Sequence, residues 1–278
     1  FVAAKKIITF FILFANFAYF EVAKSYQIEK VLNKSILVLK GPFSDGSAVV
    51  IGKNNNKYLI ITAKHILGSS NEDSYVITPQ KTTSKLKILK TFDNYDISLG
   101  IFNSSENIIP VPLNIFLNYP APYTAESYSS FLNLRSRFNT VTNEGLIAGY
   151  SLETNAVPFK IFRLINAKLI TLLEKNRDGY DLLYQASTVR GMSGGGVFGY
   201  RDCSNGRGFG LGISPDLVFP ILLGIHGRSE DYHGEGKSGI SLGIPIKNEI
   251  KDFITANAEK YGVPMGEKNI RKLVNENL

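Results

Sequence analysis

Three side chains in this sequence have the types and the order needed for nucleophilic catalysis by serine. Ser193 lies in the run Gly-Met-Ser-Gly-Gly-Gly, His65 ends the run Thr-Ala-Lys-His, and Asp96 lies in Asn-Tyr-Asp-Ile-Ser-Leu. A serine hydroxyl is a poor nucleophile near neutral pH and needs a base within hydrogen-bond reach. A histidine base in turn needs a carboxylate that fixes its tautomer and stabilises its cation. We therefore predict Ser193 as nucleophile, His65 as general base and Asp96 as orienting acid.

The order His, Asp, Ser along the chain is that of chymotrypsin, and neither subtilisin nor the α/β-hydrolases have it. The three segments resemble the trypsin/chymotrypsin superfamily, in which Ala-x-His ends a buried strand, Asp-Ile/Leu-x-Leu carries the acid and Gly-x-Ser-Gly-Gly carries the nucleophile. Asp96 follows His65 by 31 residues and Ser193 follows Asp96 by 97, which fits two consecutive β-barrels with the site between them. The resemblance implies an oxyanion hole formed by the N–H groups of Gly191 and Ser193.

The elements that would position these residues are short apolar stretches bounded by turn residues, which predict an all-β fold. Strands are expected over Ser35–Lys40, Gly46–Lys53, Tyr58–Ala63, Ser74–Thr78, Lys85–Lys90 and Ile97–Asn103, and again over Gly145–Tyr150, Lys160–Leu164, Asp181–Ala186, Gly196–Tyr200, Ile221–His226 and Ser241–Ile246. The triplet Asn54–Asn56 predicts a hairpin turn, because asparagine adopts positive φ readily. Helices are expected over Lys247–Tyr261 and Glu267–Asn277.

These elements predict two packed six-stranded antiparallel β-barrels of chymotrypsin type with a C-terminal helix. The expected boundaries are an N-terminal barrel over 24–117, a C-terminal barrel over 118–246 and a helical tail over 247–278, with residues 118–140 crossing between the barrels. A chain of 278 residues is long enough for two small barrels with a core of their own.

Composition narrows the classes of partner and cofactor. The 31 basic and 24 acidic residues give a net charge of +7, but they are scattered along the chain. Without an arginine-rich stripe with interleaved aromatics, a nucleic-acid partner is not expected. The three histidines lack a regular ligand spacing, and His233 lies in a polar loop, so no metal and no cofactor is predicted. The predicted partners are polypeptide substrates, and the predicted state is a monomer.

Two features bear on the cellular location. Cys203 is the one cysteine of the sequence, which excludes an intrachain disulfide and, within the resembling superfamily, favours a bacterial member. Two lysines precede the apolar run Ile7–Phe20, a pattern that predicts a secretory signal over 1–23 with cleavage near Ala18 or Ala23. The predicted location is secreted or periplasmic. The alternatives are an uncleaved anchor that holds the protein on a membrane, and a buried strand or helix.

Substrate preference is expected from the residues that wall the first specificity pocket. Gly-Ile-His-Gly at His226, with Thr188 five residues before Ser193, resembles glutamyl endopeptidases, where such a histidine and threonine bind the substrate carboxylate. Gly-Met-Ser-Gly-Gly and Gly-Ile-His-Gly-Arg also resemble cyanobacterial trypsin-like domains. The resemblance implies a preference for Glu or Asp before the scissile bond, with Arg190 or Arg228 assisting and a protonated His226 as the better partner. The alternative is that His226 merely fills a barrel wall.

Three functions are consistent with these motifs. The first is an exported serine endopeptidase, a hydrolase that works through an acyl-enzyme intermediate. The second is a catalytically silent relative that binds peptides or partner proteins in the same groove. The third is a quality-control protease of the HtrA kind, which usually carries a PDZ module that this sequence does not display. Met192 stands where the chymotrypsin branch has an aspartate that pairs with a newly released N-terminus, so activation by that route is not expected.

Overall fold

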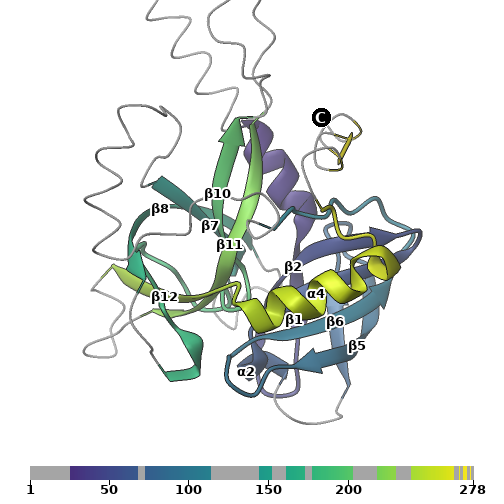
Figure 1. The fold of residues 1–278 in the computed structure, drawn as a ribbon, viewed down its shortest axis with the longest axis horizontal. Coiled ribbons are helices and arrows are strands. Elements are labelled where there is room, and N and C mark those ends of the chain that lie inside the picture. The colour runs from purple at the N-terminus through teal and green to yellow at the C-terminus, as the bar shows by residue number, and fades with distance from the viewer. Residues whose placement is uncertain are drawn as a thin grey trace, which may run out of the picture.

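Two closed β-barrels form the body of the protein. The computed structural model describes residues 26–67, 73–113, 144–151, 161–172, 177–202, 218–229 and 239–265, together with 269, 272, 273 and 276. Each barrel has six antiparallel strands, in the spatial orders β1-β2-β3-β6-β5-β4 and β10-β11-β12-β9-β8-β7. Figure 1 shows the barrels packed side by side with helix α4 across the first. The predicted fold class is confirmed.

Each predicted segment contains a strand, although β8 continues beyond its predicted end at Leu164 and β11 extends beyond its predicted segment at both ends. The first barrel contains β1 (Ile36–Lys40), β2 (Asp45–Asn54), β3 (Lys57–Thr62), β4 (Ser74–Ile77), β5 (Thr83–Thr91) and β6 (Ser98–Asn103). The second contains β7 (Glu144–Ser151), β8 (Ile161–Leu172), β9 (Leu182–Gln185), β10 (Gly196–Asp202), β11 (Val218–Ser229) and β12 (Ile240–Pro245). A short helix, α2 (Lys64–Leu67), follows β3, and a 3₁₀ turn, η2 (Arg177–Gly179), precedes β9.

The pairing of β3 with β6 explains how two distant residues meet. Thr62, the last residue of β3, pairs with Ser98, the first residue of β6. His65 follows this pair by three residues, and Asp96 precedes it by two. The tight hairpin between β2 and β3 sets the position of β3, since Asn55 in its turn takes a φ of 54° as the asparagine triplet predicts. The strand register therefore delivers both side chains to one end of the first barrel.

Helices cover the first barrel, and one of them was not predicted. Residues 26–35 are helical and bury Ile28, Val31 and Leu32, although their sequence carries no strong helix signal beyond this apolar spacing. Helix α4 (Asn248–Tyr261) agrees with its prediction and buries Ile250, Ile254, Ala258 and Tyr261 in the same core cluster. The helix expected over Glu267–Asn277 is described at 269, 272, 273 and 276, and all four residues are helical.

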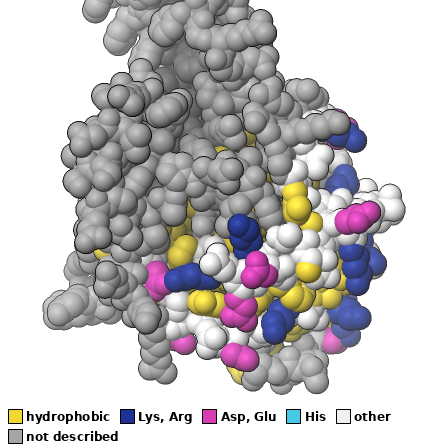
Figure 2. Space-filling model, viewed as in Figure 1, with side chains coloured by type: hydrophobic (Ala, Val, Ile, Leu, Met, Phe, Trp, Pro, Cys, Tyr) yellow, Lys and Arg dark blue, Asp and Glu magenta, His cyan; other side chains and the backbone are white. Residues whose placement is uncertain are grey.

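Several predicted features lie outside the described residues. They are the secretory signal over 1–23, the crossing segment 118–140, Cys203 and His233. No helix within the described ranges is long and apolar enough to cross a bilayer. In the same ranges, no cluster of three or more His, Cys, Asp or Glu residues could hold a metal ion. On the described part of the face in Figure 2, basic and acidic side chains both occur.

Candidate active site

His65 and Asp96 form a doubly bonded pair at one end of the first barrel. The His65 main-chain N–H donates to Oδ1 of Asp96 over 2.7 Å, and Nδ1 of the ring lies 2.5 Å from Oδ2. Asp96 is 5% exposed, whereas the His65 side chain is 43% exposed. One carboxylate therefore fixes both the backbone and the ring of His65, while the rest of the ring stays accessible.

The charge state of Asp96 is set by opposing effects. Burial raises the pKa of its carboxyl group, but the hydrogen bond and charge of His65 lower it, and the hydroxyl of Tyr180 lowers it further. The balance leaves the pKa of Asp96 below its ordinary value. Asp96 is thus an anion that accepts hydrogen bonds and stabilises a cationic imidazole.

Ser193 lies in the turn before β10, and both barrels hold that turn. The Gly194 N–H donates to the His226 carbonyl and the His226 N–H to the Gly195 carbonyl, both over 2.8 Å. From the first barrel, the Ser47 N–H donates to the Ser193 carbonyl over 2.8 Å. The position of the Ser193 side chain is therefore coupled to β2 of one barrel and β11 of the other.

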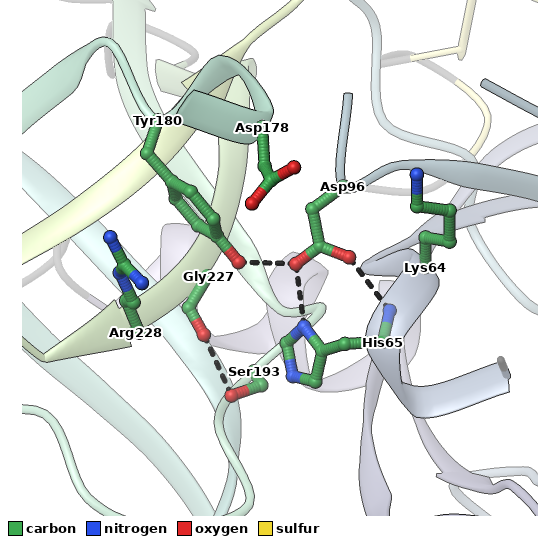
Figure 3. Close-up of a pocket in the computed structure, with 8 residues that line it drawn as sticks. All are labelled: Lys64, His65, Asp96, Asp178, Tyr180, Ser193, Gly227 and Arg228. Carbon is green, nitrogen blue, oxygen red and sulfur yellow. Dashed lines mark hydrogen bonds and ion pairs between the residues drawn. The ribbon is translucent and has the colours of Figure 1, made fainter. Parts of the chain in front are cut away.

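The Ser193 hydroxyl and the His65 ring face the same cavity (Figure 3). Within this described site, the hydroxyl donates to the main-chain carbonyl of Gly227 over 2.8 Å and not to His65. Because Nδ1 of His65 is bound to Asp96, Nε2 is the free ring nitrogen, and in Figure 3 it lies on the Ser193 side of the ring.

The turn around Ser193 also presents main-chain donors. Gly191 has a φ of 96°, a conformation that L-residues with side chains rarely adopt, and its carbonyl accepts from the Ser47 hydroxyl over 3.0 Å. Among the described residues, no main-chain carbonyl accepts from the N–H of Gly191 or of Ser193.

The residues predicted to select the substrate have different surroundings in the structure, and His226 is buried whereas Arg190 is exposed. Thr188 places Oγ1 at 2.9 Å from Oγ of Ser241. His226 is 2% exposed, and its Nδ1 is hydrogen-bonded to the hydroxyl of Tyr184. Arg190 is exposed and does not line the cavity that contains Ser193.

The charge of His226 differs from the expectation. Burial, with a smaller contribution from the charge of His65, lowers the pKa of His226 to about 3. The imidazole is therefore neutral at physiological pH. In the protein without substrate, a protonated His226 would carry an uncompensated charge, because no described acidic group contributes to its surroundings.

The cavity has a volume of about 480 Å³ and includes residues that the sequence motifs do not reveal. Its lining residues are Lys64, His65, Asp96, Asp178, Tyr180, Ser193, Gly227 and Arg228. Lys64 directs its ammonium group to the carbonyls of Phe92 and Asp93, at 3.0 and 3.3 Å, and so holds the loop before Asp96. Tyr180 and Asp178 belong to the second barrel and lie outside every recognised sequence motif. The packing of the two barrels places them on the cavity wall.

Comparison with known proteins supports the fold. No protein-family model matches the sequence, and no curated protein matches it. The inactive form of the Rv3671c protease is 12% identical with a TM-score of 0.50, over 82% of this chain and 91% of that chain. An inactive serine-to-alanine mutant of Rv3671c from M. tuberculosis H37Rv is 11% identical with a TM-score of 0.50, over 84% and 90%.

A serine endoprotease from Yersinia pestis is 17% identical with a TM-score of 0.49, over 90% of this chain and 66% of that chain. With the barrel topology, the likeness to the two Rv3671c structures shows that this chain has the two-barrel fold of trypsin-like serine proteases. The predicted nearness to glutamyl endopeptidases stays a prediction.

Proposed function

We propose that this protein is a serine endopeptidase that cleaves peptide bonds with Ser193, His65 and Asp96. The observation that carries the proposal is the 2.5 Å contact between Nδ1 of His65 and Oδ2 of Asp96, on the wall of the cavity that also contains Ser193. A buried carboxylate, a half-exposed imidazole with a free nitrogen and a serine in one cavity are the groups that acyl transfer requires.

Each group has a defined part in the reaction. The Ser193 oxygen attacks the carbonyl carbon of the peptide bond while its proton passes to Nε2 of His65, and Asp96 stabilises the resulting cation. The N–H groups of Gly191 and Ser193 bind the negative oxygen of the tetrahedral intermediate. His65 then protonates the leaving amine as the peptide bond breaks and leaves an ester on Ser193. Water, activated by His65, hydrolyses that ester and regenerates the hydroxyl.

The test is peptide cleavage by the variant Ser193→Ala. The substitution removes one oxygen, so the fold should remain, and turnover should fall by about 10⁴-fold or more. Ser84→Ala is a matched control, because Ser84 lies in β5 of the first barrel, where its hydroxyl donates to the Asn103 carbonyl, and it does not line the cavity. Cleavage retained by Ser193→Ala would contradict the proposal, and a wild-type protein that binds peptides without cleaving them would favour the silent relative.

The proposed substrate preference is a glutamate or aspartate before the scissile bond. The support is the motif resemblance at Thr188 and His226, together with the exposed guanidinium of Arg228 on the cavity wall. The Tyr184 hydroxyl is hydrogen-bonded to Nδ1 of His226 and also reaches the Leu242 carbonyl at 3.3 Å. The proposed preference uses the neutral tautomer in which Nδ1 accepts from Tyr184 and Nε2 carries the proton. A neutral N–H can donate to a carboxylate, as can a hydroxyl and a guanidinium, so the preference does not require a charged imidazole.

Paired peptides that differ by Glu or Gln before the scissile bond test this preference. We expect kcat/KM to be higher for the Glu peptide, and the Glu-to-Gln ratio to stay constant between pH 6 and 8 because His226 remains neutral there. His226→Asn should reduce the ratio several-fold. A wild-type ratio near one would overturn the acidic preference and leave His226 as a structural residue.

We also propose export, supported by the two lysines and the apolar run before residue 23. N-terminal sequencing of secreted material should then begin near Tyr19 or Lys24. An intact apolar run on protein recovered from the cytosol would contradict export, and one on membrane-bound protein would indicate the anchor.

A further inference from the structure

We infer that Tyr180, a residue of the second barrel, positions the carboxylate of Asp96 in the first barrel for its contact with His65. The inference rests on the proposed function and adds a fourth side chain to it. Tyr180 does not reach the reacting atoms itself, so its part in catalysis is exerted through Asp96.

The contacts of Asp96 carry the inference. Oδ1 accepts from the main-chain N–H of His65, while Oδ2 faces both Nδ1 of His65 and the hydroxyl of Tyr180, which donates to it. Tyr180 is 5% exposed. Burial and the charge of Asp96 raise the pKa of Tyr180, so the phenol keeps its proton and remains a donor. A donor on Oδ2 limits rotation of the carboxylate and keeps that oxygen directed at the histidine ring.

The ring of Tyr180 is fixed by its neighbours as well as by this hydrogen bond. A Cβ atom on Gly227 would lie 1.8 Å from Cε1 of Tyr180, so the ring fills the space that a side chain at position 227 would need. The guanidinium carbon of Arg228 lies over the Tyr180 ring, 4.7 Å from the ring centroid. Figure 3 shows the Tyr180 hydroxyl directed at Asp96, with Arg228 on the far side from it. Glycine at 227 is thus the residue that permits tyrosine at 180.

The backbone next to Tyr180 is also hydrogen-bonded to the backbone of Asp96. The N–H of Asp96 donates to the carbonyl of Asp178 over 2.9 Å, across the boundary between the barrels. On the other side of Tyr180, the buried carboxylate of Asp181 forms an ion pair with Lys247 at the start of α4. The segment from Asp178 to Asp181 therefore cannot shift without breaking the contacts at its two ends. The orientation of Asp96 depends in this way on the docking of the two barrels.

Kinetics of Tyr180→Phe give the first test, because phenylalanine keeps the ring over Gly227 and removes the hydroxyl alone. We expect kcat to fall about tenfold with little change in KM, since a hydrogen bond to a charged group is lost. The matched control is Tyr58→Phe, which loses a buried hydroxyl bonded to the Glu106 carbonyl in the first barrel and should keep the wild-type kcat.

A double variant separates positioning from a general structural role. If Tyr180 acts through the Asp96 carboxylate, Tyr180→Phe should cause a much smaller loss in an Asp96→Asn background than in the wild type. An equal loss in both backgrounds would overturn the inference, as would a Tyr180→Phe variant whose kcat matches that of Tyr58→Phe.

Titration of Asp96 gives a readout that does not depend on peptidase activity. The charged groups around this carboxylate are His65 and Lys64 from α2, Asp178 and Tyr180 before β9, and Arg228 from β11. In ¹³C NMR of the Ser193→Ala protein, the carboxyl carbon of Asp96 should titrate at higher pH with Tyr180→Phe and at the unchanged pH with Tyr58→Phe. An unchanged titration in Tyr180→Phe would overturn the inference, whereas absence of peptide cleavage by the wild type would overturn the proposed function alone.

Discussion

The two described histidines, one from each barrel, have opposite surroundings. His65 follows β3 of the first barrel with a side chain 43% exposed and a carboxylate at 2.5 Å. His226 lies in β11 of the second barrel, is 2% exposed and has a tyrosine hydroxyl on its ring. Both histidines have Nδ1 occupied, but by an anion in one case and by a neutral group in the other.

This difference explains why one imidazole can serve as a base and the other cannot. A general base must accept a proton, and the resulting cation needs either water or a nearby anion. His65 has both, whereas His226 has neither, and burial lowers the pKa of His226 to about 3. The second barrel therefore holds its histidine as a neutral, buried residue beside the turn that contains Ser193, and the first barrel holds the histidine that we propose as the proton acceptor.

The largest expected effect is on catalysis. His65→Ala should lower kcat/KM by about 10⁴-fold or more, because it removes the base that we propose activates Ser193. His226→Asn, whose side-chain amide can replace Nδ1 as the hydrogen-bond partner of Tyr184, should change kcat on a peptide with a neutral residue before the scissile bond by less than about tenfold. Steady-state kinetics on one neutral peptide compares the two. Similar losses in both variants would remove the distinction between the histidines.

A smaller effect is expected on stability as a function of pH. The pKa of His226 is about 3 in the folded protein, against an ordinary value of 6.5. Between these values the unfolded chain binds a proton that the folded protein does not, so stability is complete above pH 6.5 and is lost as the pH falls towards 3. From pH 7 to 5 this amounts to about 2 kcal/mol.

Urea unfolding of the wild type and of His226→Asn at pH 7 and 5 measures this loss. The free energy of unfolding of the wild type should fall by about 2 kcal/mol more than that of the variant over this interval. Equal losses in the two proteins would mean that His226 takes up a proton in the folded state as readily as in the unfolded chain.

The sequence was sufficient for the parts of the structure that depend on local pattern. Short apolar stretches bounded by turn residues, together with the asparagine turn, predicted strands that the structure contains, and the helical spacing of Ile250 and Ile254 predicted α4. The meeting of His65 and Asp96 was predicted from family-like motifs. In the structure its physical cause is the register that pairs Thr62 with Ser98.

The parts that could not be predicted depend on how the barrels pack. Tyr180 lies 84 residues from Asp96 in a segment without a motif, and nothing local indicates that its hydroxyl reaches the other barrel. The neutral state of His226 in the protein without substrate could not be predicted from its residue type, because its burial is a property of the assembled second barrel. The helix over residues 26–35 is held by burial of Ile28 and Leu32 in the core cluster of the first barrel, a tertiary effect that outweighs weak local signals.

The most direct test of the central claim is labelling of Ser193 by a fluorophosphonate, followed by mass spectrometry of the modified peptide. The reagent phosphonylates a serine whose hydroxyl is activated by a neighbouring base. We predict that the wild type is labelled at Ser193, that His65→Ala is labelled far more slowly, and that Ser193→Ala is not labelled. An unlabelled wild-type protein, or equal labelling rates with and without His65, would contradict the assignment of Ser193 as a nucleophile activated by His65.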